Sequence, residues 1–471
     1  MTSADVVVVG GGPAGIAAAL EAAASGARVL LIDEASQVGG QIYRQLTPGL
    51  RPLAGDRLGR DREESQPLLS ALGRAPVTVW TGVEVWGIFP ERVVALCRDG
   101  RADRVQAGAL VLATGAYDRP VAFPGWTLPG VVTAGGTTAL VKSQRLLPGR
   151  RVLLAGTGPL LLAAAVALVD GGAEVVGIAE AAPRTALAGL LRRPRMVGKA
   201  LDVLATLRKA GVPMWARHGI VRAEGTDGVE RAVVAEWDEA WRVRHGTERV
   251  LDVDTVCLGY GLVPSTELAQ LAGCTVAYRP GQGGWVPIAD PERLMATSAP
   301  GVFVAGDGAG VAGAETAEAE GRLAGLGAAR HLGRLDEKAA LARGRAPLRR
   351  LAALAGFRQA LEQVLAPRPG LAQLATDDTL VCRCEEVPAR EVRAAVEDGA
   401  RQLTEVRAAT RCGMGLCQGR MCAPTVAALV ARWAGVTPES AGRLTPRPPV
   451  RPVAVSALAD EALVEPLPAH A

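Results

Sequence analysis

The sequence has little lysine, little histidine and few aromatic side chains. Only four of its 52 basic residues are lysine, histidine occurs four times, and aromatic residues make up 3% of the 471 residues. We attribute this pattern to coding bias. The 52 basic residues are nearly balanced by 48 acidic ones, so the overall charge favours neither nucleic acid nor an anionic membrane. We expect neither partner.

Long hydrophobic runs are also missing. One uncharged, largely apolar run covers residues 152–169, which only reaches the lower limit for a membrane-spanning helix. Because Gly156, Gly158 and Pro159 interrupt its first half, it predicts a strand, a turn and a buried helix. No charged segment precedes the first apolar run, which starts near residue 5. We therefore expect no secretory signal and a cytoplasmic protein.

Cysteine is absent from residues 1–96 and 98–256, whereas five of the eight cysteines fall within residues 382–422. In a cytoplasmic chain such a cluster indicates metal or redox chemistry rather than disulfides. The other three, Cys97, Cys257 and Cys274, are expected to be small buried apolar residues.

What the sequence does contain is two copies of a strand, glycine turn, helix and strand pattern. They lie at residues 6–34 and 151–180, and each is typical of a βαβ nucleotide-binding unit. Strands that end in glycine return at residues 253–261 and 301–310, so we expect the second unit to interrupt the first domain. The length gives a prior of about three domains. The predicted segments are 1–117 plus 285–335 (first dinucleotide domain), 118–284 (second dinucleotide-type domain), 336–375 (helical linker), 376–435 (cysteine module) and 436–471 (proline-rich tail).

The first unit has the features of a phosphate site. Gly10, Gly12 and Gly15 follow a strand of four valines and open a helix, where free amides and the helix dipole favour a pyrophosphate. Asp33 follows Gly15 at the end of the next strand, where it can accept hydrogen bonds from an adenosine ribose. The alternative is a glycine turn without a ligand.

Four segments resemble the flavoproteins with two dinucleotide-binding domains: GGGPAG at 10–15, VGGQ at 38–41, ATG at 113–115 and GVFVAGDGA at 301–309. The resemblance implies FAD, with Asp307 at the ribityl chain and Thr114 and Gly115 near the flavin. ADP or ATP in the same cleft is the alternative. The expected cofactor-binding residues are Gly10, Gly12, Pro13, Ala14, Gly15, Asp33, Glu34, Gly40, Gln41, Thr114, Gly115, Gly306 and Asp307.

The second unit departs from the pattern. Leu161 stands at its third glycine position, and Glu180 comes one residue later than Asp33 does in the first unit. A leucine there crowds the helix against the strand, so the unit either binds NAD(P)H or is a vestigial domain that serves packing. Disulfide reductases of the same superfamily carry a cysteine pair beside the flavin, and the missing cysteines exclude that activity. No histidine lies in a motif, so no general base is predicted.

The cysteine module has a C-x-C pair, Cys382 and Cys384, followed by Cys412, Cys417 and Cys422. This spacing is compatible with a [2Fe-2S] cluster, with zinc or with ordinary thiols. It resembles the bacterioferritin-associated ferredoxin module, which implies a small helical iron-sulfur domain. That resemblance assigns Cys382, Cys384, Cys417 and Cys422 as ligands, with Cys412 as the fallback. Arg383, Arg411 and Arg420 flank the cysteines and either offset the cluster charge or are solvated.

Residues 1–435 resemble the larger, α-type subunit of heteromeric amino-acid dehydrogenases, the group of opine oxidases, proline and hydroxyproline dehydrogenases and hydrogen cyanide synthase. The segments that carry this resemblance are 113–131, 133–136, 381–387 and 410–422. The fold expected is α/β, with two Rossmann-like dinucleotide-binding domains and the small iron-sulfur domain.

The resemblance implies that a glycine-oxidase-like, FAD-containing β subunit oxidises an amino acid, imino acid or opine. This chain would then pass electrons through flavin and cluster to a quinone or other acceptor. It also implies peripheral contact with a quinone-reducing system, an FMN site shared with the β subunit, and one further small, ferredoxin-like subunit. Two other classes stay open: a self-contained NAD(P)H-dependent reductase, and a non-enzymatic ferredoxin-like interaction protein.

Overall fold

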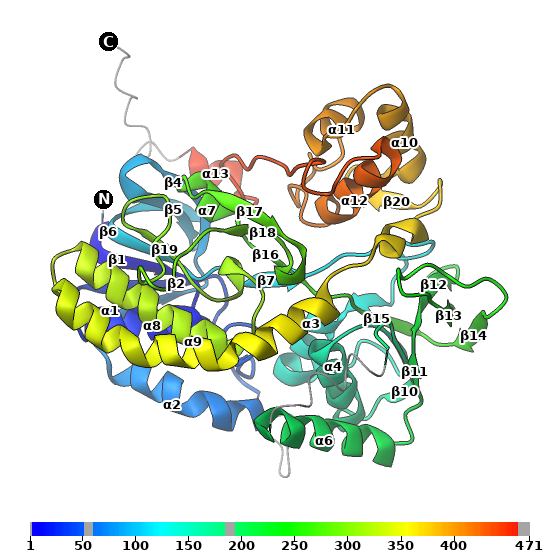
Figure 1. The fold of residues 1–471 in the computed structure, drawn as a ribbon, viewed down its shortest axis with the longest axis horizontal. Helices are drawn as coiled ribbons and strands as arrows, with labels where there is room; N and C mark the ends of the chain where they lie inside the picture. Colours follow the sequence, from blue (N-terminus) through cyan, green and yellow to red (C-terminus); the bar gives the residue numbers. More distant parts are fainter. Residues whose placement is uncertain (1, 51–59, 184–193, 460–471) are drawn as a thin grey trace.

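A computed structural model describes residues 2–50, 60–183 and 194–459. Its first sheet is built mainly of parallel strands (Figure 1). In spatial order these are β3 (Val77–Thr81), β2 (Val29–Asp33), β1 (Thr2–Val9), β6 (Arg101–Leu112), β5 (Val93–Arg98) and β4 (Glu84–Phe89). β5 and β4 are antiparallel. β19 (Val302–Val304) pairs in parallel with the second half of β6, so a late segment completes the sheet that the first residues begin.

Helices α1 (Pro13–Ala23), α8 (Ala314–His331) and α9 (Glu337–Leu365) lie together on one face of this sheet (Figure 1). Small residues allow α1 and α8 to pack closely: a Cβ added to Gly321 would lie 2.1 Å from the Ala14 carbonyl oxygen. Glu21 of α1 pairs with Arg322 of α8 at 3.0 Å and with Arg343 of α9 at 2.7 Å. The alanine-rich sequence therefore gives a tight three-helix layer. Helix α2 (Arg60–Arg74) connects β2 to β3.

The second sheet is parallel and has the order β11 (Met214–Ala216), β10 (Glu174–Glu180), β9 (Arg151–Gly156), β15 (Thr255–Gly259), β8 (Val131–Thr133). It is covered by α3 (Ala134–Ala139), α4 (Pro159–Asp170) and α6 (Pro194–Lys209). The run 152–169 thus forms a strand, a turn and a helix, as predicted. No helix within the described ranges combines the length and apolarity needed to cross a bilayer.

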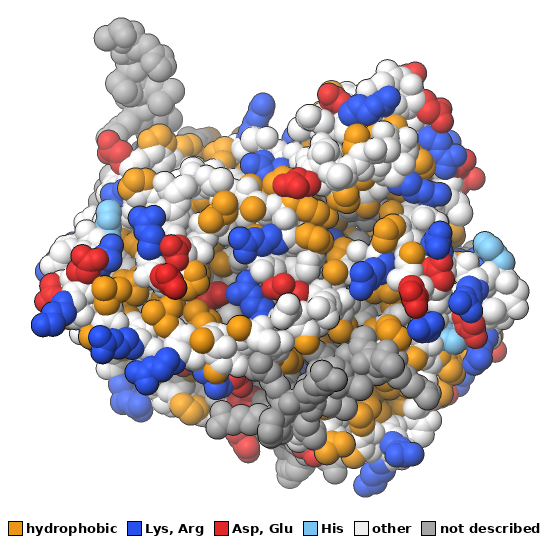
Figure 2. All heavy atoms as spheres, viewed as in Figure 1, with side chains coloured by type: hydrophobic (Ala, Val, Ile, Leu, Met, Phe, Trp, Pro, Cys, Tyr) orange, Lys and Arg blue, Asp and Glu red, His pale blue; other side chains and the backbone are white. Residues whose placement is uncertain are grey.

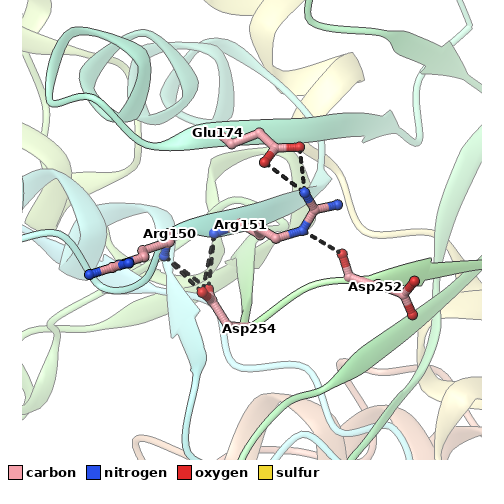
Figure 3. A network of polar contacts seen from close by, with 5 residues as sticks. All are labelled: Arg150, Arg151, Glu174, Asp252 and Asp254. Carbon is pink, nitrogen blue, oxygen red and sulfur yellow. Dashed lines mark hydrogen bonds and ion pairs between the residues drawn. The ribbon is translucent and has the colours of Figure 1, made fainter.

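A polar network fixes the beginning of β9 (Figure 3). The guanidinium of Arg151 contacts both carboxylate oxygens of Glu174 on β10 at 2.8 and 2.7 Å and donates to the Asp252 carbonyl at 3.3 Å. The Asp254 carboxylate accepts the backbone amides of Arg150 and Arg151 at 2.9 and 3.2 Å. These contacts tie β9 to its neighbours at the end of the sheet opposite the glycine turn.

Smaller elements complete the body. β12 (His218–Glu224), β13 (Arg231–Glu236) and β14 (Arg249–Asp252) form an antiparallel sheet, and β7 (Ala116–Asp118) pairs with β16 (Leu262–Pro264). β17 (Val276–Arg279) pairs with β18 (Gly284–Pro287), and α7 (Glu267–Leu271) precedes them. The β7–β16 ladder follows directly after β6 and β15, so it joins the two large sheets.

The cysteine module lies above the second sheet and β16–β18 (Figure 1). It contains β20 (Leu380–Cys382), β21 (Val387–Pro388), α10 (Ala389–Glu397), α11 (Leu403–Thr410) and α12 (Ala423–Ala434). One continuous apolar core joins it to the body, because Phe123 and Trp126 belong to the same cluster as Val381 and Leu429. The Trp126 indole also donates to the Leu380 carbonyl at 2.6 Å.

The proline-rich segment after α12 crosses from the module to the first sheet. Leu444 packs against the cysteine-bearing loop at Gly413 and Gly419. The Val450 amide donates to the Trp86 carbonyl of β4 at 2.8 Å, and α13 (Val455–Leu458) ends the described chain. On the face shown in Figure 2, acidic and basic side chains are interspersed.

Candidate functional site

The first glycine turn forms a tight cradle between β1 and α1. A Cβ at Gly15 would lie 1.7 Å from the Gly10 carbonyl oxygen, so only glycine permits this helix-to-strand contact. Gly12 is the N-cap of α1 and Pro13 its first residue. A Cβ at Gly40 would lie 2.8 Å from the Gly12 Cα, and one at Gly306 would lie 2.8 Å from the Ala14 Cβ. Residues 10–15, Gly40 and Gly306 therefore meet at one place.

The acid at the end of β2 is held in this cradle. The Asp33 carboxylate accepts the Gly11 amide at 2.5 Å and the Ala35 amide at 2.7 Å. Burial raises the pKa of Asp33, and these amides oppose the shift. Glu34 instead lies at the surface and pairs with Arg451 of the proline-rich segment at 3.1 Å, while Gln41 accepts a hydrogen bond from Arg44. Glu34 and Gln41 are thus engaged outside the glycine turn.

The other predicted flavin contacts approach from β6 and β19. The Thr114 hydroxyl donates to the Ser265 carbonyl at 2.6 Å, and the Ser265 amide donates to the Gly115 carbonyl at 2.9 Å. A Cβ at Gly308 would lie 2.9 Å from the Thr114 hydroxyl. Asp307 Oδ1 accepts the Ala312 and Gly313 amides at 3.0 and 3.2 Å. Within the described ranges its second oxygen, Oδ2, has no hydrogen-bond partner.

Glu320 is a site residue that sequence reasoning missed. It is buried in α8, accepts the Gly306 amide at 2.9 Å and faces Arg358 at 3.8 Å. Burial raises its pKa to about 7. Helix α8 contains three glutamates, Glu315, Glu318 and Glu320, and nothing in the sequence distinguishes the third. Only the packing of α8 against Gly306 defines the role of Glu320.

The second glycine turn retains more of the nucleotide-binding geometry than its sequence indicates. A β-bulge between Val175 and Gly177 absorbs the extra residue, so Glu180 pairs in register with Gly156. Its carboxylate accepts the Gly158 amide at 3.4 Å and the Ala182 amide at 2.9 Å. Leu161 is fully buried against Gly259, which has no side chain to obstruct it. The bulge therefore corrects the one-residue shift of Glu180, and Gly259 provides space for the leucine that replaces the third glycine.

Burial raises the pKa of Glu180 to about 7 from an ordinary value of 4.5. The unfolded chain ionises this carboxyl at a lower pH than the folded chain, so its contribution to stability is lost as pH rises from 4.5 through 7. The Glu180→Gln variant should gain stability relative to the parent over this window, by up to about 3 kcal/mol at pH 8. Urea unfolding at pH 5 and pH 8 measures the difference. Glu174→Gln, at an exposed position of the same strand, is the control, and parallel pH profiles for the parent and Glu180→Gln would contradict the expectation.

Three cysteines of the module lie together and are buried. The sulfurs of Cys382, Cys412 and Cys422 are within 4.8 Å of one another. Hydrogen bonds from Cys412 and then Cys422 lower the pKa of Cys382 to about 2, whereas the pKa values of Cys412 and Cys422 are raised, chiefly by Cys382. Of the three, Cys382 is thus the one whose thiolate is favoured, and the thiolate is the form that binds metal. Cys412, the fallback ligand in the assignment that the resemblance implies, belongs to this group.

The remaining two cysteines of the module form a pair nearer the surface. Cys384 is exposed and Cys417 half-buried, and burial, with the Cys417 thiol adding to it, raises the pKa of Cys384. The loop between them packs closely, since a Cβ at Gly415 would lie 2.4 Å from the Cys384 Cβ. Because a [2Fe-2S] cluster takes four thiolates on two irons, a buried group of three and an outer pair fit this cofactor with one cysteine in excess.

Arg420 connects the cysteine loop to the rest of the molecule. Its guanidinium donates to the carbonyls of Cys417 at 3.4 Å and Val450 at 2.5 Å and pairs with Glu267 of the body at 3.1 Å. Its side chain is only 13% exposed. By contrast Arg411 is 71% exposed and pairs with Glu385 inside the module.

Replacing Arg420 by methionine should therefore destabilise the chain by about 2 kcal/mol, because it leaves the Glu267 carboxylate and the Val450 carbonyl without their partner. Arg411→Met should cost less than about 1 kcal/mol. The free energy of unfolding in urea tests both variants, and limited proteolysis reports whether the tail is released. Equal effects of the two substitutions would show that Arg420 does not couple these parts.

The histidines give no general base at these sites. His218 lies against Trp215, His331 lies against Phe303, and His245 pairs with Glu248; His470 lies outside the described residues. All eight cysteines are free, and Cys97, Cys257 and Cys274 are separate from the module. Cys257 and Cys274 are buried, but Cys97 is partly exposed.

The chain belongs to the pyridine nucleotide-disulphide oxidoreductase family, whose model matches residues 4–321. Residues 380–432 match the BFD-like [2Fe-2S] binding domain. FAD and a [2Fe-2S] cluster are thus its cofactors, and the predicted fold class is confirmed.

Relatives along the full chain are components of larger enzymes. An opine oxidase subunit of Rhizobium meliloti (strain 1021) is 37% identical, over 98% of this chain and 99% of the relative. Hydrogen cyanide synthase subunit HcnB of Pseudomonas aeruginosa is 35% identical, over 96% and 97%. L-proline dehydrogenase from P. horikoshii has the same fold, with a TM-score of 0.69 and 22% identity over 97% of this chain and 80% of that one. The predicted resemblance to this group of dehydrogenase subunits is confirmed.

Proposed function

We propose that this chain is the electron-transfer subunit of a heteromeric flavin-dependent dehydrogenase that oxidises an amino acid, imino acid or opine. The observation that carries the proposal is the presence, in one chain, of the glycine cradle at residues 10–15 and of a buried cysteine group, whose module shares its apolar core with the second sheet. Flavin accepts two electrons at once and an iron-sulfur cluster passes them singly. The full-length similarity to the opine oxidase and hydrogen cyanide synthase subunits supports the presence of partner chains.

The residues of this chain bind and position rather than attack substrate. The cradle at Gly10, Gly12 and Gly15 offers backbone amides to a pyrophosphate, and Asp33 and Asp307 are placed to accept hydroxyl groups. Hydrogen bonds from Cys412 and Cys422 lower the pKa of Cys382, which favours its role as a metal ligand. The resemblance to α-type dehydrogenase subunits supports a substrate pocket on a glycine-oxidase-like β subunit. The proposal also includes an FMN site shared with the β subunit, a quinone as electron acceptor and a small ferredoxin-like subunit. The cytoplasm, where thiols stay reduced, is its proposed location.

We propose further that four of the five module cysteines bind the cluster, with Cys384 and Cys417 at one iron and two of the buried three at the other. The set that the resemblance implies, Cys382, Cys384, Cys417 and Cys422, satisfies this grouping, and Cys412 in place of Cys422 satisfies it equally. Iron content of Cys412→Ser and Cys422→Ser distinguishes the two sets, because the fifth cysteine can be replaced without loss of iron.

Co-expression with a glycine-oxidase-like subunit tests the function. Under anaerobic conditions, an amino acid or opine should bleach the flavin and cluster absorption of the complex and leave this chain alone unchanged. NADH should not bleach the isolated chain. If substrate bleaches the isolated chain, or never bleaches the complex across amino acids, imino acids and opines, the proposal is wrong.

A second function, that of an NAD(P)H-dependent reductase, is favoured by one observation: the bulge that returns Glu180 to register at the second glycine turn. Rapid bleaching of the isolated chain by NADH would support it. In that case, Glu180→Gln should weaken NADH binding while FAD remains bound, since only the second turn is altered.

A further inference from the structure

Glu320 lies beside the residues that pack on the start of α1. Its side chain is buried in the first half of α8, and its Oε2 accepts the Gly306 amide at 2.9 Å. A Cβ added to Gly306 would lie 2.8 Å from the Ala14 Cβ, and one added to Gly321 would lie 2.1 Å from the Ala14 carbonyl oxygen. Glu320 is therefore adjacent to the helix end that we assign to the FAD pyrophosphate.

In the described part of the chain, one basic and one acidic side chain act directly on Glu320. Arg358 of α9 lies 3.8 Å from its Oε1, but the Arg358 Nε also donates to Glu362 at 3.1 Å. Asp307 is the acidic neighbour. The single titratable residue of α1, Glu21, pairs with arginines of α8 and α9. A negative charge on Glu320 is thus only partly compensated, which is costly in a buried site.

Burial favours the protonated form of this carboxyl. It raises the pKa of Glu320 to about 7, while Arg358 and the Gly306 amide oppose the shift and Asp307 adds to it. The pyrophosphate of FAD remains ionised around neutral pH and adds negative charge next to the carboxyl. Charges interact strongly inside a protein, where the effective dielectric constant is low. Bound FAD should therefore raise the pKa of Glu320 further.

We propose that Glu320 is a positioning residue of the FAD site that couples cofactor binding to the uptake of a proton. In its neutral form the carboxyl still accepts the Gly306 amide, so the loop that carries Asp307 keeps its place and no extra charge lies near the pyrophosphate. In its ionised form Glu320 repels the pyrophosphate. FAD should therefore bind more tightly at low pH than at high pH. This inference rests on the proposed placement of FAD in the Gly10 cradle.

The test uses the full chain with its cluster, from which FAD has been removed. Because Glu320 is protonated below about pH 7 with or without FAD, the affinity should be constant there and should fall as pH rises further. We expect a loss of about tenfold between pH 6 and pH 9, which corresponds to a pKa shift of about one unit. Fluorescence titration measures the affinity. Calorimetry at pH 8, in two buffers of different ionisation enthalpy, should show net proton uptake. An affinity independent of pH, or release of protons on binding, would overturn the proposal.

Variants at Glu320 separate its charge from its hydrogen bond. Glu320→Gln keeps an acceptor for the Gly306 amide but cannot ionise, so it should bind FAD equally well at both pH values and without proton uptake. Glu320→Leu also removes the acceptor and should bind FAD weakly at both. Glu318→Gln is the control, since Glu318 lies on the same helix, is 37% exposed and pairs with Arg322; it should retain the pH profile of the parent. If Glu320→Gln also retains that profile, another group takes up the proton and the proposal is wrong.

Two arginines of α9 provide an independent comparison. Arg358 faces Glu320, whereas Arg350 pairs with Glu315 near the surface of α8. Arg358→Gln removes the positive charge that favours ionised Glu320, so the fall in affinity should move to higher pH. Arg350→Gln should not move it. An unchanged profile in Arg358→Gln, or an equal shift in both variants, would contradict the proposal. Substrate bleaching of the FAD-loaded complex is measured at one pH, so failure of the proposed function is seen separately.

Discussion

Cys382→Ser should remove the iron-sulfur cluster, with iron falling from about two per chain to less than about a tenth of that. Cys382 is in contact with both other buried cysteines, Cys412 and Cys422, and its sulfur is the one whose pKa is lowered. A serine hydroxyl cannot supply the same ionised ligand near neutral pH. Iron and sulfide analysis together with visible absorption measures the loss.

The matched control is Cys257→Ser. Cys257 is also buried on a strand, but it lies in the second sheet, where its sulfur contacts the Thr137 hydroxyl at 3.3 Å. The iron content of the Cys257→Ser variant should be unchanged, and both Cys257→Ser and Cys382→Ser should retain bound FAD. Iron that survives in Cys382→Ser, or falls equally in Cys257→Ser, would refute the assignment of Cys382 as a ligand.

Gly12→Ala should weaken FAD binding at least about tenfold while the fold is preserved. Gly12 has an ordinary φ of −77°, and an added Cβ would lie 3.7 Å from the Gly40 Cα, a normal contact. The protein thus tolerates the methyl group, but the methyl group stands where the backbone must approach the pyrophosphate. Fluorescence titration of the FAD-free chain measures the affinity.

Two further glycine-to-alanine substitutions serve as controls for Gly12→Ala. Gly73→Ala in α2 meets no atom within 4 Å and should leave FAD affinity unchanged. Gly15→Ala would place its Cβ 1.7 Å from the Gly10 carbonyl oxygen and should disrupt the turn itself. If Gly12→Ala binds FAD as the parent does, the glycine turn is not the pyrophosphate site; if its stability falls as in Gly15→Ala, the loss of FAD is a folding effect.

The first dinucleotide unit could be predicted because its chemistry is local. Gly10, Gly12 and Gly15 follow one another in the chain, and close backbone approach requires glycine wherever this turn forms. The sequence also predicted the second βαβ unit, but it could not show whether that unit keeps the geometry of a nucleotide-binding turn. The bulge that realigns Glu180 and the space that Gly259 provides for Leu161 arise from strand pairing, which residue spacing alone does not reveal.

The arrangement of the cysteines in the module could be predicted only in part from the sequence. The spacing of the five cysteines indicated a metal site, and the resemblance to the bacterioferritin-associated ferredoxin module assigned Cys382, Cys384, Cys417 and Cys422 as ligands, with Cys412 as the fallback. The fold of the loop after α11 brings Cys412 beside Cys382. The contacts of Arg420 and Glu320 could not be predicted from the sequence either. Their partners, Glu267 and Gly306, are not sequence neighbours and are brought to them only by the fold.

The contact between Val450 and β4 has a consequence for self-association. In the spatial order of the first sheet, β4 is the terminal strand, and its outer backbone groups could template pairing with a strand of another molecule. The Val450 amide occupies the Trp86 carbonyl, and Pro448 and Pro449 beside it cannot donate a hydrogen bond. A chain truncated before residue 448 would leave the edge strand β4 uncovered, and we expect such a protein to aggregate although its cofactor sites remain in place.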